Sequence, residues 1–323
     1  MGFLVLAGRD LLRIFAIYCG MAIGATSYSV FHVGASADTY ESTADLWKYG
    51  FGQWIVVILL FCLVVLKIPQ PLQALSLLLV ATYSLSADYR SLAINCALTT
   101  VIALVGWGAA TRVPRWAQIA FVAVSGTAMY VMVPRLAASG FLGDAIKRKT
   151  EDQLAEGVPF ILAGRTESPL SISAIAERPW FGWASANNIN AEVFDHAKSL
   201  AISLGFDPAV PIESGWYFAN GDVSLHSILL GSWAEGGLFA ALLPLGLVIA
   251  ALAMIWNAPR YGRWSVLVIA ASLQAVWDLF FSPWSYGSLA GFALLALVFA
   301  ARHMPSQPHL ETKEFLRWTS TPQ

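Results

Sequence analysis

The sequence has few charged residues, little cysteine and no excess of positive charge. Only 12% of its 323 residues are Asp, Glu, Lys or Arg, about half the share of a soluble domain. The net charge of −1 leaves no basic surface of the kind that binds nucleic acid, which we exclude as a partner. Cys19, Cys62 and Cys96 lie in apolar segments without the close spacing of a zinc or redox site. We expect them to be small core residues.

Short motifs that mark common catalytic and nucleotide-binding sites are also missing. The chain contains no H-E-x-x-H, C-x-x-C or G-x-S-x-G pattern and no P-loop. These absences argue against metallohydrolases, serine hydrolases and ATPases, and we expect neither a cofactor nor a metal ion. The apolar segments also lack an inverted duplication, which weakens the case for a transporter.

Long apolar runs are what the sequence does have. Hydrophobic residues make up 57% of the chain, and the mean hydropathy is +0.63. Because about 20 apolar residues cross a bilayer as a helix, the runs predict an all-α, polytopic membrane protein with about eight transmembrane helices and a single membrane domain over residues 1–323. The predicted spans are 12–31, 51–67, 70–87, 91–110, 116–133, 223–256, 264–281 and 286–301.

Basic residues predict the orientation of these spans. Two short connections carry Arg112 with Arg115 and Arg260 with Arg263, and such connections stay in the cytoplasm. An even number of spans then places both termini in the cytoplasm. A signal peptide ending near Ala35–Ala37 is the alternative, but the first apolar run is longer than the apolar core of a signal peptide.

The longest connection, residues 134–222, joins predicted spans five and six and is expected in the periplasm. A serine and a proline predict a short helix from residue 168 to about 178. Apolar residues at three- and four-residue steps predict a second helix over 187–204, which could lie on the membrane surface. Between them, the aromatic segment 180–183 is interpreted as an interfacial anchor or, alternatively, as part of a ligand site.

A histidine at the start of predicted span six is the first candidate for chemistry. Asn220, Gly221 and Asp222 predict a turn and a helix N-cap, which sets His226 one helical turn beyond Asp222. The carboxylate would then orient the imidazole as a general base. The alternative is that Asp222 only caps the helix and His226 only lies at the interface.

Arginines at the predicted outer face are the second set of candidates. Arg90 ends the short connection 86–90 between spans three and four, where a flexible loop has no room. A guanidinium there could bind pyrophosphate oxygens, or it could snorkel or pair with Asp88. Arg165 and Arg178 are two further candidates in the outer loop.

Predicted span six is too long for a bilayer. Residues 223–256 would form a helix of about 51 Å, so it must project outward or bend, most naturally at Gly236–Gly237 or Pro244. Glu235 would point away from His226 on this helix. It could bind an arginine of another helix or brace the bundle.

Three segments together resemble the bacterial O-antigen ligase and O-antigen polymerase superfamily. The first is the span-ending turn Ser86–Arg90. The second is the outer loop in which Arg165 is followed by a helix and by the turn Glu177–Trp183. The third is the helix start at His226, which continues to Glu-Gly-Gly-Leu at Glu235–Leu238.

This resemblance implies a GT-C-like membrane fold and an inverting, metal-independent glycosyltransferase at the periplasmic face of the bacterial inner membrane. The donor would be a glycan on undecaprenyl pyrophosphate, and the acceptor a lipid A-core sugar or another glycan. Arg90 and Arg165, with Arg178 nearby, would bind the pyrophosphate, and membrane lipids would surround the bundle.

The same resemblance assigns roles to residues of predicted span six. His226 would deprotonate or orient the acceptor hydroxyl, with Glu235 in support. Ser227 stands where the family has an asparagine, so it keeps a hydroxyl but lacks the amide. Two other classes stay open. A carrier or flippase would hold its charges nearer the membrane midplane, and a non-catalytic assembly subunit would tolerate loss of His226.

Overall fold

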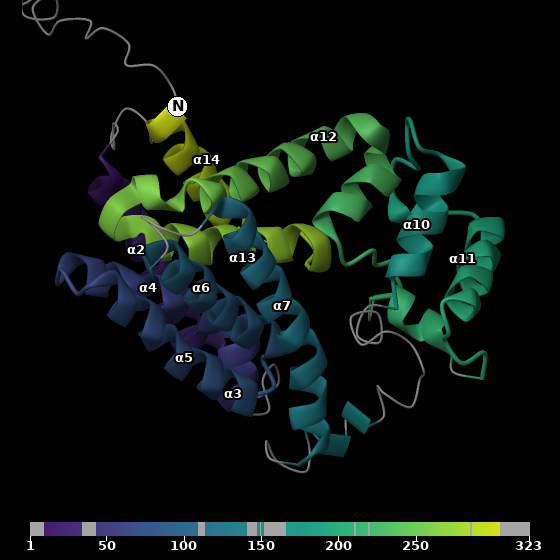
Figure 1. Ribbon diagram of the computed structural model, residues 1–323. Coiled ribbons are helices and arrows are strands. Elements are labelled where there is room, and N and C mark those ends of the chain that lie inside the picture. Colours follow the sequence, from purple (N-terminus) through teal and green to yellow (C-terminus); the bar gives the residue numbers. More distant parts are fainter. Residues whose placement is uncertain are drawn as a thin grey trace, which may run out of the picture.

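The computed structural model describes residues 10–33, 43–108, 114–140, 147–148, 150–151, 166–209, 211–218, 220–284 and 286–303. Over these residues the chain is helical, with one isolated β-bridge between Tyr217 and Val223 (Figure 1). The prediction of an all-α protein is therefore confirmed for this part of the chain. Its main helices are α2 (Leu11–Tyr28), α3 (Thr43–Asp45), α4 (Gly52–Val65), α5 (Gln70–Ser86), α6 (Arg90–Gly108), α7 (Arg115–Ala138), α10 (Ser168–Glu177), α11 (Ala191–Ser203), α12 (Ile228–Trp256), α13 (Ser265–Phe281) and α14 (Tyr286–His303).

Every predicted span overlaps a helix. Helices α2, α4, α5, α6, α7, α12, α13 and α14 match the predicted spans in order, and α7 continues through Pro134 to Ala138. In the described part, three segments are long and apolar enough to cross a membrane: Leu11–Phe31, Ile228–Trp256 and Ala258–Phe281. The protein therefore has the helices of a membrane protein, while eight crossings and the periplasmic side of the long loop stay predictions.

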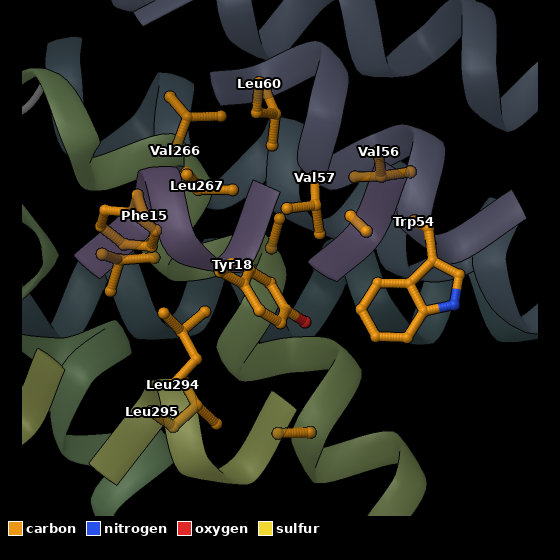
Figure 2. Packing of buried hydrophobic residues seen from close by; sticks show 14 of the residues in the cluster. Phe15, Tyr18, Trp54, Val56, Val57, Leu60, Val266, Leu267, Leu294 and Leu295 are labelled. Carbon is orange, nitrogen blue, oxygen red and sulfur yellow. The ribbon is translucent and has the colours of Figure 1, made fainter. Parts of the chain in front are cut away.

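The core of the bundle lies where α2, α4, α13 and α14 meet. Phe15 of α2 stacks on Trp264 with ring centroids 4.8 Å apart. Figure 2 shows Phe15 and Tyr18 between Val57 of α4, Leu267 of α13 and the side chains of α14. Burial of these apolar side chains against one another, rather than against lipid, holds the helices in register.

Apolar side chains also cover the outside of the helices. Leu79 of α5 is 76% exposed and Ile249 of α12 is 68% exposed, which fits contact with lipid rather than water. Cys19 and Cys96 are buried as expected, whereas Cys62 is exposed on the outward face of α4.

Residues 166–227, which we call the cap, form a second and smaller core beside the bundle. The cap contains α10, α11 and two short helices, η3 (Ala186–Asn188) between them and η4 (Ile212–Trp216) after α11. The fully buried Trp216 lies at the centre of this core. Helix α11 begins after the N-cap Asn190, whose side chain accepts from Val193 N, and it ends before Gly205 in the left-handed region. Its apolar face, with Val193 and Ala197, packs inside the cap. It is therefore not available for the membrane surface.

Candidate functional site

The helix that follows His226 begins later than predicted. α12 starts at Ile228, and Ser227 is its N-cap, with a hydroxyl that accepts from Leu230 N at 3.1 Å. The same hydroxyl donates to the Leu279 carbonyl of α13 at 3.3 Å. The predicted start at residue 223 was wrong, because Val223 forms a β-bridge with Tyr217 and thereby closes a turn, which we call the bridged turn. Ser227 thus joins the helix start to the bundle.

Asp222 does not cap a helix and does not contact His226. Its carboxylate accepts from Asn187 Nδ2 at 2.8 Å and from Asn220 Nδ2 at 2.7 Å. Asn187 Oδ1 in turn accepts from Val223 N at 2.7 Å. The predicted Asp222–His226 pair is therefore wrong, and Asp222 fastens the bridged turn to the cap.

The carboxylate beside His226 belongs to Glu167, the residue before α10. Glu167 Oε1 lies 3.1 Å from His226 Nδ1, and the hydroxyl of Ser224 also contacts this nitrogen. The Phe218 ring packs against the imidazole with centroids 5.4 Å apart. The Glu167 side chain is 12% exposed and that of His226 is 31% exposed, so the pair is shielded on the carboxylate side and open on the imidazole side.

Backbone strain accompanies this arrangement. His226 has φ +38°, a left-handed conformation that non-glycine residues seldom adopt and that surrounding structure must hold in place. It lies between the bridged turn and the first turn of α12. The imidazole is thereby directed towards Glu167 instead of along the face of a helix.

The pair can act as a general base. Nδ1 lies 3.1 Å from the Glu167 carboxylate and is hydrogen-bonded to the Ser224 hydroxyl, which can either donate or accept. In the tautomer that carries its proton on Nδ1, next to the carboxylate, the Nε2 lone pair is available. A fixed tautomer with a carboxylate behind it is the arrangement that activates a hydroxyl nucleophile. Sequence reasoning missed Glu167, because no local spacing connects it to His226.

Helix α12 is broken three turns after His226, and the cap fills the break. Gly237 has φ +70°, which releases the carbonyls of Ala234 and Glu235 from helical hydrogen bonds. They accept from Trp183 N at 2.9 Å and Ala184 N at 2.7 Å. The predicted bend at Gly236–Gly237 is confirmed at Gly237, and Figure 1 shows α12 turning next to α10.

Two glycines permit this close approach. A Cβ on Gly182 would overlap the Glu235 carbonyl, and one on Gly237 would overlap the Trp180 carbonyl. The Glu235 side chain adds a further link, because its Oε1 accepts from Ala186 N at 2.9 Å. Glu235 forms no ion pair with an arginine of the described residues, and its side-chain hydrogen bond is to the cap rather than to another helix of the bundle.

Arg178 and the aromatic segment have separate environments. The guanidinium carbon of Arg178 lies 4.0 Å from the centre of the Trp183 ring, a cation–π contact. Trp183 is buried, and its Nε1 donates to the Ala174 carbonyl at 3.0 Å. Trp180 and Phe181 are 60% and 82% exposed. Only these two are therefore free to anchor at an interface.

Arg90, the first residue of α6, belongs to a cluster of charged side chains with Asp88 and Lys48. Its Nε is 2.9 Å from Asp88 Oδ1, and its terminal nitrogen donates to Thr150 Oγ1 at 3.0 Å. Lys48 approaches the other Asp88 oxygen at 3.6 Å. The Arg90 side chain is 13% exposed, so the guanidinium is held rather than mobile. Arg165 lies outside the described residues.

At the break in α12, the structure brings together two of the three segments that carry the resemblance: the turn Glu177–Trp183 and the helix that follows His226. Arg90 belongs to a different set of contacts, at the start of α6. Among the described residues, no group of three or more His, Cys, Asp or Glu side chains could hold a metal ion. No protein-family model, curated protein or solved structure matches the chain.

Proposed function

We propose that this protein is a membrane-bound, inverting glycosyltransferase of the O-antigen ligase or polysaccharide polymerase type. The observation that carries the proposal is the His226–Glu167 pair, with a contact of 3.1 Å and an imidazole that is only partly covered. The pair is held where the cap meets α12, whose start at His226 carries the strongest part of the resemblance. The proposed site faces the periplasm of a bacterial inner membrane.

In the proposed reaction, Nε2 of His226 removes the proton from an acceptor hydroxyl. The acceptor oxygen attacks the anomeric carbon of a glycan on undecaprenyl pyrophosphate, and the bond from that carbon to the pyrophosphate oxygen breaks. The lipid pyrophosphate leaves with the electron pair of that bond. Because the acceptor oxygen attacks from the opposite face, the configuration at the anomeric carbon is inverted. The acceptor is a lipid A-core sugar or another lipid-linked glycan. The proton passes from the imidazole to water.

Charge on the leaving group requires compensation. Arg90, positioned by Asp88 and Thr150, presents a planar set of donors suited to phosphate oxygens. Arg165 is proposed to share this role. Preorganised positive charge can replace a metal ion for a leaving group as good as pyrophosphate, so no cofactor is invoked. Arg178 is better assigned to holding Trp183.

The test uses purified protein with undecaprenyl-pyrophosphate glycan and acceptor, in buffer containing a metal chelator. Transfer should proceed in the wild type and fall by about 10²- to 10⁴-fold in His226→Ala, the usual contribution of a general base. Transfer that survives this substitution, or that needs a divalent metal, would overturn the mechanism.

A carrier for a lipid-linked or small solute is the second candidate. The observation that favours it is a polar recess inside the bundle, lined by Asp278, Gln274 and Asn95. A carrier would move substrate across a vesicle membrane without forming a glycosidic bond. Glycan ladders from cells carrying His226→Ala separate these candidates from a non-catalytic subunit, which would tolerate the substitution.

A further inference from the structure

A small recess lies inside the bundle, between α2, α4, α6, α13 and α14. Its wall includes one carboxyl group, several amides and several hydroxyls, although the surrounding helices are apolar. Ionisable and polar groups at such positions are costly and usually serve binding or transport. The polar groups used in the argument are Tyr18, Asn95, Thr99, Gln274 and Asp278.

A chain of hydrogen bonds crosses the recess and ends on Asp278. Asn95 Nδ2 donates to Gln274 Oε1 at 3.0 Å, and Gln274 Nε2 donates to Asp278 Oδ1 at 3.0 Å. Ser282 Oγ donates to the same carboxyl oxygen at 3.1 Å. Both donors therefore reach Oδ1, and no described residue donates to Oδ2. The carboxyl group of Asp278 thus receives two hydrogen bonds, which suits a carboxylate because its oxygens only accept.

Asp278 has no basic partner among the residues described. No lysine, arginine or histidine of this part of the chain forms an ion pair with it; the nearest charged group along α6, Arg90, pairs with Asp88. A carboxylate in an apolar bundle needs a positive charge nearby to offset its desolvation. The described helices supply none, so the carboxyl group is neutralised either by a proton or by a bound cation.

Neutral oxygens are available around the carboxyl group. The Tyr18 side chain is 8% exposed, lines the recess, and its hydroxyl has no hydrogen-bond partner among the described residues. Figure 2 shows this hydroxyl pointing away from the helix backbone of α2 towards Trp54. The Thr99 hydroxyl donates a hydrogen bond to the backbone carbonyl of Asn95 at 2.7 Å, so the lone pairs of the hydroxyl oxygen can still bind a ligand. The Asn95 side-chain carbonyl accepts no hydrogen bond from a described residue.

We propose that this recess is a binding site for a small monovalent cation, Na⁺. Asp278 supplies the single negative charge, and the side-chain oxygens of Asn95, Thr99 and Tyr18 supply neutral ligands. Hard cations prefer oxygen ligands, and a divalent ion is normally held by more than one carboxylate. One carboxyl group among neutral oxygens therefore selects a monovalent ion. The proposal is independent of the transferase mechanism.

The experiment measures the thermal unfolding midpoint of the full-length protein in detergent, at constant pH and ionic strength, with Na⁺ replaced by choline. A ligand that binds only the folded state raises the midpoint in a saturable way. The wild type should therefore be stabilised by Na⁺, and Asp278→Asn should lose this response. Asp195→Asn, which removes an exposed carboxylate from α11, is the matched control and should keep it.

Tyr18→Phe gives a second measurement that does not depend on the folding of the Asp278 variant. It removes a hydroxyl without a described hydrogen bond, so the fold should be kept. The Na⁺ concentration for half-maximal stabilisation should rise by about tenfold or more, as for loss of one ligand-shell interaction. Equal midpoints in Na⁺ and choline, a response to pH alone, or a full Na⁺ response in Asp278→Asn would each overturn the proposal.

Discussion

The Glu167 carboxylate lies 3.1 Å from Nδ1 of His226. Glu167 precedes the first helix of the cap, while His226 precedes Ser227, the N-cap of α12. Both residues belong to the cap and lie near its two ends, so the proposed base is assembled only when these ends come together beside the start of α12. Predictions about the site and about the cap are consequently linked.

Glu167→Gln should impair transfer without unfolding the protein. The amide keeps the shape of the side chain but cannot offset the positive charge that develops on the imidazole. We expect the turnover number to fall by about 10- to 100-fold, less than for loss of the base itself, with little change in the acceptor KM. Steady-state kinetics with lipid-linked donor and acceptor measure both constants.

Glu192→Gln is the matched control for this variant. It removes the same charge from an exposed position in the first turn of α11, away from His226. Its kinetic constants should equal those of the wild type. If Glu167→Gln were as active as this control, the carboxylate would have no part in the reaction.

Gly237→Ala should loosen the cap. Alanine is strained at φ +70°, and its Cβ would overlap the Trp180 carbonyl. We expect a loss of about 2 kcal/mol or more from these two effects, seen as a lower unfolding temperature and faster proteolysis within the cap. Gly246→Ala lies in the same helix with nothing within 4 Å of the added Cβ. Gly246→Ala should raise the free energy of unfolding by up to about 1 kcal/mol. Equal stability of the two variants would show that the contact between the cap and Gly237 does not hold the cap in place.

Arg90→Lys should separate pyrophosphate binding from a purely structural role. Lysine keeps the charge and can still reach Asp88, but it lacks the planar fork that matches phosphate oxygens. We expect the donor KM to rise by about tenfold while the unfolding temperature stays within a few degrees. Arg260→Lys, at an exposed position between α12 and α13, is the control. An unchanged donor KM in Arg90→Lys would remove Arg90 from the proposed site.

The predicted orientation can be tested with single cysteines in a variant that lacks Cys19, Cys62 and Cys96. Asp195→Cys in the cap should react with a membrane-impermeant maleimide added to spheroplasts. Arg260→Cys should react only after the membrane is permeabilised, because the basic connection is predicted to face the cytoplasm. Both positions are exposed in the structure, so the reverse pattern of labelling would invert the topology.

Composition and periodicity were sufficient for the helices. Apolar runs bounded by glycine, proline and basic residues predicted the long helices of the bundle, because helix length and hydropathy are local properties. The helical segment 43–51 was not predicted. The bend at Gly237 was also predictable, since glycine pairs in a long apolar helix are its weakest point. Local patterns failed at the start of α12, where Asn220–Asp222 form a bridged turn and Ser227 caps the helix.

By itself, the sequence determined that this is a helical membrane protein and that His226, Arg90 and Glu235 needed explanation, because charge is scarce in such a chain. Only the tertiary structure decided their partners. Glu167 meets His226, Asp88 meets Arg90, and the backbone of the cap meets Glu235. Two of these contacts join segments distant in the chain, and hydrogen-bond partners at such separations follow from packing, not from any local pattern of residues.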